Sequence, residues 1–342
     1  MEKKQDNLME ISDLTVRYNT DDAVVHAVNN FNLKLVRGEA RGLVGETGAG
    51  KTTLALSILR LLPERVGEVT GGSIVYDGQE LLNLPEAEML PLRGKRISMI
   101  FQDPMTSLNP TQTVGDQILE VLNLHFPEMT RDEKNKRVDE MMTLVGIPPQ
   151  RKKSFPHEFS GGMKQRVVIA MALVAEPELL LADEPTTALD VTIQAQILRL
   201  MNDLQKENGT AIMFITHDLG VINEMADDVV VMYCGQVVEQ APARVIFTNC
   251  EKSHPYTEGL MYSIPRLNDD RKKLDPIPGA VPHPLDLPKG CKFAPRCKYC
   301  TQKCIDAEPE LKQVAEGQYV RCFYPDKEER RSAEHGKIVV HY

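Results

Sequence analysis

The sequence predicts an α/β protein in which helices cover a parallel sheet. Helical and strand patterns alternate from Ser160 to Tyr233, which is typical of parallel strands joined by helices. A glycine-rich loop, Gly45–Gly50, lies between a short apolar strand and a helical pattern, and a second apolar run ends in Asp183-Glu184. Both places follow predicted strands, at the edge where open α/β sheets bind their ligands.

The composition is that of an ordinary globular protein of 342 residues, with 42% apolar and 26% charged residues. This length suits one large domain with an appendage, or two domains. The longest apolar run, Val167–Ala175, is far too short to cross a bilayer, and Met1–Glu10 lacks the apolar segment of a secretory signal. A net charge of −9 disfavours a dedicated nucleic-acid-binding protein.

The N-terminal part is expected to be rich in strands. Alternating apolar residues predict a half-buried strand over Phe31–Leu35, and Gly42–Val44 forms a second that leads into the glycine-rich loop. A helix is expected over Lys51–Leu62. A glycine pair and an Asp-Gly turn delimit a strand over Ser73–Tyr76, and Ile97–Phe101 is predicted to form another.

Composition changes toward the C-terminus. Residues 113–146 are predicted to be mostly helical, and five prolines from Pro276 to Pro288 predict an extended, helix-free linker. Residues 1–250 carry a net charge of −11, whereas residues 251–342 carry +2 and five of the seven cysteines. We therefore expect a C-terminal part that differs in character from the rest of the chain.

The glycine-rich loop and the start of the following helix match the phosphate-loop pattern G-x-x-x-x-G-K-[ST]. The match consists of Gly45, Glu46, Thr47, Gly48, Ala49, Gly50, Lys51 and Thr52. Glycines let backbone N–H groups turn toward phosphate oxygens, and the helix dipole adds to the attraction. Lys51 is expected to reach the β- and γ-phosphates, Thr52 to bind Mg²⁺, and Thr53 to face the α-phosphate. The alternative is a glycine turn that only caps a helix.

The second apolar run, Leu179–Ala182, has the character of a buried parallel strand. Asp183 at its end is expected to hold Mg²⁺, directly or through water. Glu184, one residue further, is suited to polarise the water that attacks a γ-phosphate. The alternative is a strand that ends in a solvated acidic turn, and the phosphate loop in the same chain favours the functional interpretation.

A second candidate anion site opens the helix that begins near Ser160. Ser160 is a good N-cap, and Gly161 and Gly162 expose backbone donors at the positive end of the helix dipole. The apolar stripe from Val167 to Val174 would pack this helix against the sheet. A generic capped helix is the alternative, but the segment lies between the phosphate loop and the acidic strand.

The order of these motifs resembles that of the ATP-binding subunits of ABC transporters. The resemblance covers about Leu8–Gln240. The signature motif would be Ser160–Gln165, in which Met163 stands in place of the commonest Gln. The other matching positions are Gln102 as the Q-loop glutamine, Ala188-Leu189-Asp190 as the D-loop, His217 as the switch histidine and Tyr18 as the aromatic that stacks on adenine. It implies an α/β P-loop NTPase (ABC ATPase) cassette over residues 1–250, with an N-terminal antiparallel β subdomain and a helical signature subdomain at about 105–175. Residues 251–342 would form a Cys-rich C-terminal extension.

The resemblance also implies a mechanism. Two ATPase subunits dimerise head to tail, so that Ser160, Gly161 and Gly162 contact the ATP held by the phosphate loop of the partner. Asp183 and Gln102 would join Thr52 around Mg²⁺. Glu184 would be the general base, His217 would contact the γ-phosphate, and Gln102 would also begin the segment that faces the membrane subunits.

Longer stretches are similar to the ATPases of peptide and nickel importers, especially the oligopeptide and dipeptide class. They are Phe101–Pro110, Asp183–Gln196, His254–Thr257, Pro276–Gly279 and Cys291–Cys297. This resemblance implies a peripheral protein on the cytoplasmic face of a prokaryotic plasma membrane. Its partners would be a second, non-identical ATPase, two permeases and an external substrate-binding protein. Peptide is preferred to nickel on similarity alone, because the ATPase never touches the substrate.

Four cysteines in the tail, Cys291, Cys297, Cys304 and Cys322, could close a thiolate site for zinc or an iron–sulfur cluster. The resemblance to peptide importers implies a [4Fe–4S] cluster on these four residues, with zinc or no metal as alternatives. Cys300 departs from the family pattern and leaves the individual ligand assignments open. Two other cysteines, Cys234 and Cys250, are interpreted as small structural residues.

Two other classes of protein fit the motifs less well. A soluble ABC protein of DNA repair or translation would usually carry long coiled-coil insertions or two cassettes, and the chain has one cassette and no sustained heptads. A small-molecule P-loop kinase would leave the signature and His217 unexplained. A transport ATPase is therefore the preferred hypothesis.

Overall fold

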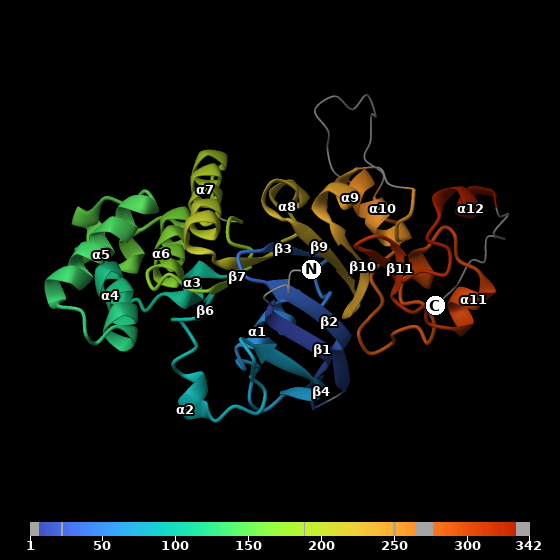
Figure 1. The fold of residues 1–342 in the computed structure, drawn as a ribbon, viewed down its shortest axis with the longest axis horizontal. Helices are drawn as coiled ribbons and strands as arrows, with labels where there is room; N and C mark the ends of the chain where they lie inside the picture. The colour runs from blue at the N-terminus through green and yellow to red at the C-terminus, as the bar shows by residue number, and fades with distance from the viewer. Residues whose placement is uncertain (1–6, 22, 188, 249–250, 264–275, 333–342) are drawn as a thin grey trace, which may run out of the picture. The chain divides into compact units, whose positions relative to one another are not determined.

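The computed structural model (Figure 1) describes residues 7–21, 23–187, 189–248, 251–263 and 276–332. The chain divides into two compact units. The first unit comprises the described parts of Met1–Glu10, Lys34–Arg41 and Val75–Thr216. The second comprises those of Ile11–Leu33, Gly42–Ile74 and His217–Tyr342. Each unit is described by itself.

A parallel sheet forms the centre of the first unit. Strands β6 (Ile97–Ile100), β7 (Leu179–Asp183) and β8 (Ala211–Ile215) are neighbours in that order, and β6 and β8 both run parallel to β7. Every residue of the three strands is buried, as expected for strands covered on both faces. The parallel sheet predicted from the alternating pattern is confirmed.

Helices make up most of the rest of the first unit. They are α2 (Glu86–Met89), α3 (Pro104–Ser107), α4 (Val114–His125), α5 (Arg131–Leu144), α6 (Gly161–Leu173) and α7 (Val191–Asn208), with 3₁₀ turns at Pro149–Lys153 and Pro156–Glu158. Helices α4, α5 and α6 lie side by side, as Figure 1 shows in green and yellow-green. Thr113 caps α4, and a reciprocal capping box between Thr130 and Glu133 begins α5. The predicted helical character of residues 113–146 is confirmed.

The N-terminal strands lie mostly in the second unit. Strand β1 (Asn7–Asn19) lies between β2 (Val24–Val36) and β4 (Gly67–Tyr76), and β4 also pairs with the short β5 (Gln79–Glu80). Only antiparallel strands can be neighbours across a connection as short as that between β1 and β2. The antiparallel β subdomain is therefore present. Strand β3 (Ala40–Val44) crosses from the first unit into the second.

Two predicted boundaries in this region were wrong. Strand β4 begins at Gly67 rather than Ser73. The glycine pair that was expected to precede the strand lies inside it, where Gly72 has a φ of 91°. A Cβ atom at Gly72 would lie 2.5 Å from the Cα of Leu14, so this glycine permits a close approach of two strands. Helix α1 (Lys51–Ile58) ends before Leu62, and Arg60 beyond it has a left-handed φ of 53°.

The C-terminal extension continues a sheet of the second unit. Strands β9 (Asp228–Tyr233), β10 (Gln236–Pro242), β12 (Gln318–Val320) and β11 (Lys312–Ala315) are successive antiparallel neighbours. Helices α8 (Leu219–Met225), α9 (Ala243–Phe247), α10 (Pro255–Tyr262), α11 (Gln302–Asp306) and α12 (Lys327–Ser332) complete the described part, as Figure 1 shows in yellow to red. Residues 276–290 contain no helix, as predicted for the proline-rich linker.

Buried polar and aromatic contacts fix the extension to β9 and β10. The fully buried Glu239 carboxylate accepts hydrogen bonds from the His254 backbone N–H (2.7 Å) and from Gln318 Nε2 (3.0 Å). The ring of Tyr233 lies 4.7 Å from that of Tyr256 and 5.3 Å from that of Phe293, centroid to centroid. Aromatic pairs of this kind contribute about 0.5–1.5 kcal/mol each beyond the area they bury. The extension is therefore packed against the sheet, not tethered loosely to it.

Candidate functional site

The phosphate loop lies in the second unit, at the start of α1. Gly50 precedes the helix in the left-handed conformation, with a φ of 96°, and a Cβ atom there would lie 2.3 Å from the Ala27 carbonyl oxygen. Only glycine fits this position without displacing backbone. The Lys51 ammonium donates to the carbonyl oxygens of Gly45 (2.7 Å) and Glu46 (3.1 Å), so the side chain lies along its own loop.

Tyr18 lies beside the first turn of the same helix. Its hydroxyl and the Thr53 hydroxyl are 3.2 Å apart, and its side chain is half-buried. The structure therefore brings together the predicted adenine-stacking residue and the predicted phosphate-binding residues. His217 belongs to the same unit, follows β8 and is exposed.

The acidic pair lies in the first unit, at the carboxyl end of β7. Asp183 is 1% exposed and Glu184 is 8% exposed. Glu184 has a left-handed φ of 51°, which is uncommon for a residue with a side chain, and its backbone N–H donates to the Ile215 carbonyl at 2.8 Å. Its carboxylate accepts a hydrogen bond of 2.8 Å from the Thr187 hydroxyl. Backbone strain of this kind is concentrated at functional sites.

The signature segment and the Q-loop glutamine also belong to the first unit. Ser160 caps α6 by accepting from the Met163 backbone N–H at 3.4 Å, which confirms the predicted N-cap. Gln165 on that helix donates a buried hydrogen bond of 3.0 Å to the Pro185 carbonyl, directly after Glu184. Gln102 is exposed two residues beyond β6, whose register with β7 places it at the same sheet edge as the acidic pair.

The sequence-predicted nucleotide residues are thus divided between the two units. Gln102, Ser160, Gly161, Gly162, Asp183 and Glu184 are in the first unit, and Tyr18, His217 and the phosphate loop with Thr53 are in the second. Two predicted positions, Ala188 and Cys250, lie outside the described residues. Asp190, at the end of the predicted D-loop, caps α7 by accepting from the Ile193 backbone N–H at 3.1 Å.

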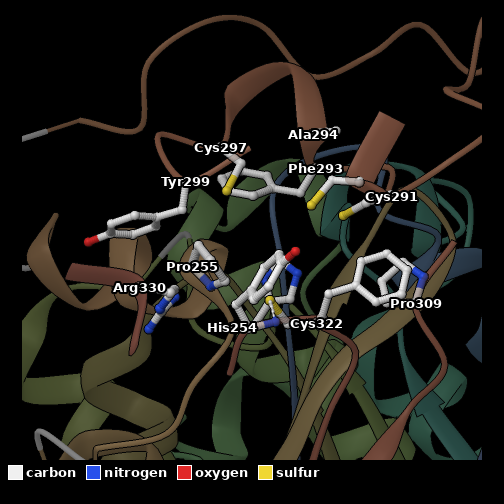
Figure 2. A pocket seen from close by; sticks show the side chains of 13 residues that line it. His254, Pro255, Cys291, Phe293, Ala294, Cys297, Tyr299, Pro309, Cys322 and Arg330 are labelled. Atoms are coloured by element: carbon white, nitrogen blue, oxygen red, sulfur yellow. Dashed lines mark hydrogen bonds between the residues drawn. The ribbon is translucent and has the colours of Figure 1, made fainter. Parts of the chain in front are cut away.

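Four cysteines of the extension line one apolar cavity. They are Cys291, Cys297, Cys304 and Cys322, and all are free thiols. Figure 2 shows Cys291 and Cys297 on one side of the cavity and Cys322 on the other. Cys300 is not part of the lining, and its thiol donates weakly to the Thr301 carbonyl at 3.6 Å. Cys300 nevertheless packs in the same buried cluster as Cys304, with Cys291 and Cys297 against it.

Burial favours the neutral form of three of these thiols, those of Cys291, Cys297 and Cys322. Burial raises the pKa of Cys291 to about 12 and that of Cys322 to about 11, and it also raises the pKa of Cys297. A metal that binds here must displace these protons. In the part of the chain that the structure describes, no three His, Cys, Asp or Glu side chains are grouped closely enough to surround a single ion.

A buried arginine lines the same cavity. Arg330 is 2% exposed, and its guanidinium nitrogens have no hydrogen-bond partner among the described residues. It forms an ion pair with Glu258, whose Oε2 lies 3.3 Å from Nη2, and its guanidinium lies 5.0 Å from the centroid of the Tyr299 ring. A buried cation that lacks full pairing favours an anionic group nearby.

One contact at the phosphate loop has no signal in the local sequence patterns. The Arg296 guanidinium forms a two-pronged ion pair with Glu46 of the phosphate loop, at 2.6 Å and 3.1 Å. The two residues are 250 positions apart, and no local pattern relates them. The only sequence signal was that Arg296 stands immediately before Cys297 in the segment that resembles peptide importers.

Comparisons with known proteins agree with these motifs. The family model described as "ABC transporter" matches residues 28–187, and that described as "Oligopeptide/dipeptide transporter, C-terminal region" matches residues 238–304. The dimeric ATP-binding cassette MJ0796 bound to ADP and Pi has a similar fold, with a TM-score of 0.64 and 27% identity over 69% of this chain and 99% of that one. The cbiO1 protein of Clostridium perfringens gives a TM-score of 0.59 and 32% identity over 71% and 92% of the two chains.

Similarity to curated proteins extends over almost the whole chain. The oligopeptide transport ATP-binding protein OppD of Salmonella typhimurium is 49% identical over 94% of this chain and 95% of its own length. OppD of Escherichia coli is 48% identical over 96% of each chain. OppD of Bacillus subtilis is 49% identical over 93% of this chain and 90% of its own.

The fold and the ordered motifs define an ATP-binding cassette of the ABC transporter class. Within that class, the identity over both the cassette and the C-terminal region is decisive. The chain belongs to the family of oligopeptide transport ATP-binding proteins. No helix among the described residues is long and apolar enough to cross a membrane.

Proposed function

We propose that this chain is the ATP-hydrolysing subunit that powers import of oligopeptides through a membrane transporter. The observation that carries the proposal is the similarity to OppD proteins, which spans the cassette and the C-terminal region together. Nickel or another small solute remains the second candidate substrate, because no residue of an ATPase subunit contacts the cargo. The cassette would comprise residues 1–250, and the extension residues 251–342.

The nucleotide-binding residues would have the roles that the family resemblance implies. Tyr18 would stack on adenine, and the phosphate loop would hold the phosphates with Lys51 at the β- and γ-positions. Thr52, Asp183 and Gln102 would surround Mg²⁺, which neutralises charge on the β- and γ-phosphates when bound. The support is local: Tyr18 lies against Thr53, Gln102 follows β6, and Asp183 ends the neighbouring strand β7.

Hydrolysis would depend on Glu184 and His217. Glu184 would accept the proton of the attacking water, and the hydrogen bond from Thr187 would orient its carboxylate. His217 would contact the γ-phosphate. Ser160, Gly161 and Gly162 would complete the ATP site of a partner ATPase in a head-to-tail dimer, and the similar MJ0796 structure is itself a dimer.

The assembled transporter would contain a second homologous ATPase, two permeases and an external substrate-binding protein. In it, this chain would lie on the cytoplasmic face of the plasma membrane. When the complex is reconstituted in proteoliposomes, oligopeptides with the binding protein should stimulate ATP hydrolysis, and Ni²⁺ should not. Stimulation by Ni²⁺ without peptide would replace the first candidate substrate with the second.

We also propose that the cavity of the extension binds a [4Fe–4S] cluster through Cys291, Cys297, Cys304 and Cys322. Each thiol of such a cluster bonds a different iron, whereas one zinc ion draws all its ligands to about 2.3 Å from one point. Four thiols that line one cavity but are not grouped around a point suit the larger group. A cluster held by these thiolates would cross-link segments of the extension.

Anaerobically purified protein should be brown, with a broad absorption band near roughly 400 nm from thiolate-to-iron charge transfer. Each of Cys291→Ser, Cys297→Ser, Cys304→Ser and Cys322→Ser should weaken this band, as measured by absorption and iron content. Cys300→Ser is the matched control and should keep the band. Colourless protein with stoichiometric zinc would establish zinc instead, and absence of both metals would rule out a metal site here.

A further inference from the structure

The second residue of the phosphate loop is held by the C-terminal extension. The Glu46 carboxylate accepts hydrogen bonds from both terminal nitrogens of Arg296, whose side chain is only 4% exposed. The Glu46 backbone N–H donates to the Tyr256 hydroxyl at 2.8 Å. Backbone and side chain of the same loop residue are therefore both bound by residues far along the chain, within one compact unit.

The arginine in turn is fixed on its other sides. Its Nε donates to the Pro278 carbonyl of the proline-rich linker at 3.0 Å, and Nη1 approaches the Tyr233 hydroxyl at 3.4 Å. Burial lowers the pKa of Arg296, but its hydrogen bonds to Glu46 and Tyr233 outweigh this and hold the pKa above its ordinary value. A charged guanidinium with a single fixed orientation suits a bidentate carboxylate partner.

The negative charge of Glu46 would oppose phosphate binding by the loop if it had no cationic partner. The loop presents its N–H groups and Lys51 to the phosphates of a nucleotide, and a carboxylate within the loop opposes that attraction. Lys51 also donates to the Glu46 carbonyl, so a shift of Glu46 reaches the lysine directly. Arg296 cancels the carboxylate charge and fixes its direction.

We infer that Arg296 is a positioning residue for the phosphate loop, which neutralises and orients Glu46 so that the loop can bind the phosphates of ATP. This inference rests on the proposed ATPase function. Arg296 ends the 3₁₀ turn Ala294–Arg296, which lies between Cys291 and Cys297. Through it, the cysteine-lined segment of the extension supports nucleotide binding.

The test is the affinity of the purified full-length chain for Mg-ATP, measured by equilibrium binding at low temperature. Arg296→Met should weaken binding about tenfold, because it exposes the nucleotide phosphates to an uncancelled carboxylate. Glu46→Gln should bind about threefold tighter, because the loop then carries a net positive charge from Arg296. In the Glu46→Gln background, Arg296→Met should cost less than about threefold, which is the signature of a pair that acts through its charges.

Lys298→Met, which removes an exposed cation two residues away, is the matched control and should leave the affinity unchanged. If Arg296→Met does not fold, as judged by its thermal unfolding, Arg296→Lys is the second variant. It keeps the charge, loses the two-pronged geometry, and should weaken binding by an intermediate factor.

The inference is overturned if both arginine variants bind Mg-ATP as the wild type does, or if Glu46→Gln fails to reduce the cost of Arg296→Met. Failure of the proposed function has a different result: the wild-type chain would then show no nucleotide binding that depends on Lys51.

Discussion

Replacement of Lys51 by Ala should lower ATP hydrolysis by the reconstituted transporter by about 10²–10³-fold. Lys51 is the first residue of α1, and its ammonium group lies 2.7 Å from the carbonyl oxygen of Gly45 in the phosphate loop. In the proposed site it stabilises the charge that develops on the β- and γ-phosphates, and no other cation of the loop can replace it. The measurement is steady-state phosphate release with the ATP site of the partner ATPase inactivated.

Lys136→Ala provides the control, since Lys136 is an exposed lysine of α5 whose side chain is 80% exposed. It should hydrolyse ATP at the wild-type rate. Wild-type turnover by Lys51→Ala under the same conditions would exclude this loop as the phosphate-binding site.

Replacement of Glu184 by Gln should slow hydrolysis by about 10²–10⁴-fold while ATP binding persists. The amide preserves the shape of a side chain that is 8% exposed and held by Thr187, but it cannot accept the proton of the attacking water. ATP should therefore accumulate unhydrolysed between two subunits. Single-turnover hydrolysis and gel filtration with and without Mg-ATP would measure the rate and the dimer.

Glu140→Gln, at a half-exposed glutamate of α5, is the corresponding control and should retain normal turnover. Normal hydrolysis by Glu184→Gln would reduce Glu184 to a strand-end carboxylate that orders Thr187. Loss of ATP binding together with hydrolysis would indicate a structural role for this residue at the end of β7.

Local sequence patterns were enough to predict most elements that carry the candidate nucleotide site. Lys51 begins a helix directly after the glycines, and Ser160 caps α6, because both depend on backbone conformations that neighbouring residues impose. The buried run before Asp183 forms a parallel strand, since its residues have no polar face to expose. Local patterns failed at Gly72, which looked like the start of a strand and instead lies within β4.

By itself, the sequence determined the phosphate loop, the acidic strand, the signature helix and the family of the chain. Each of these features consists of a few consecutive residues, so its local conformation and chemistry depend little on the rest of the fold. Only the tertiary structure decided which cysteines share a cavity and that Arg296 binds Glu46. Such contacts join residues up to 250 positions apart. The pairing of β10 with β12 and the packing of Phe293 on Tyr233 create them, and neither can be read from spacing along the chain.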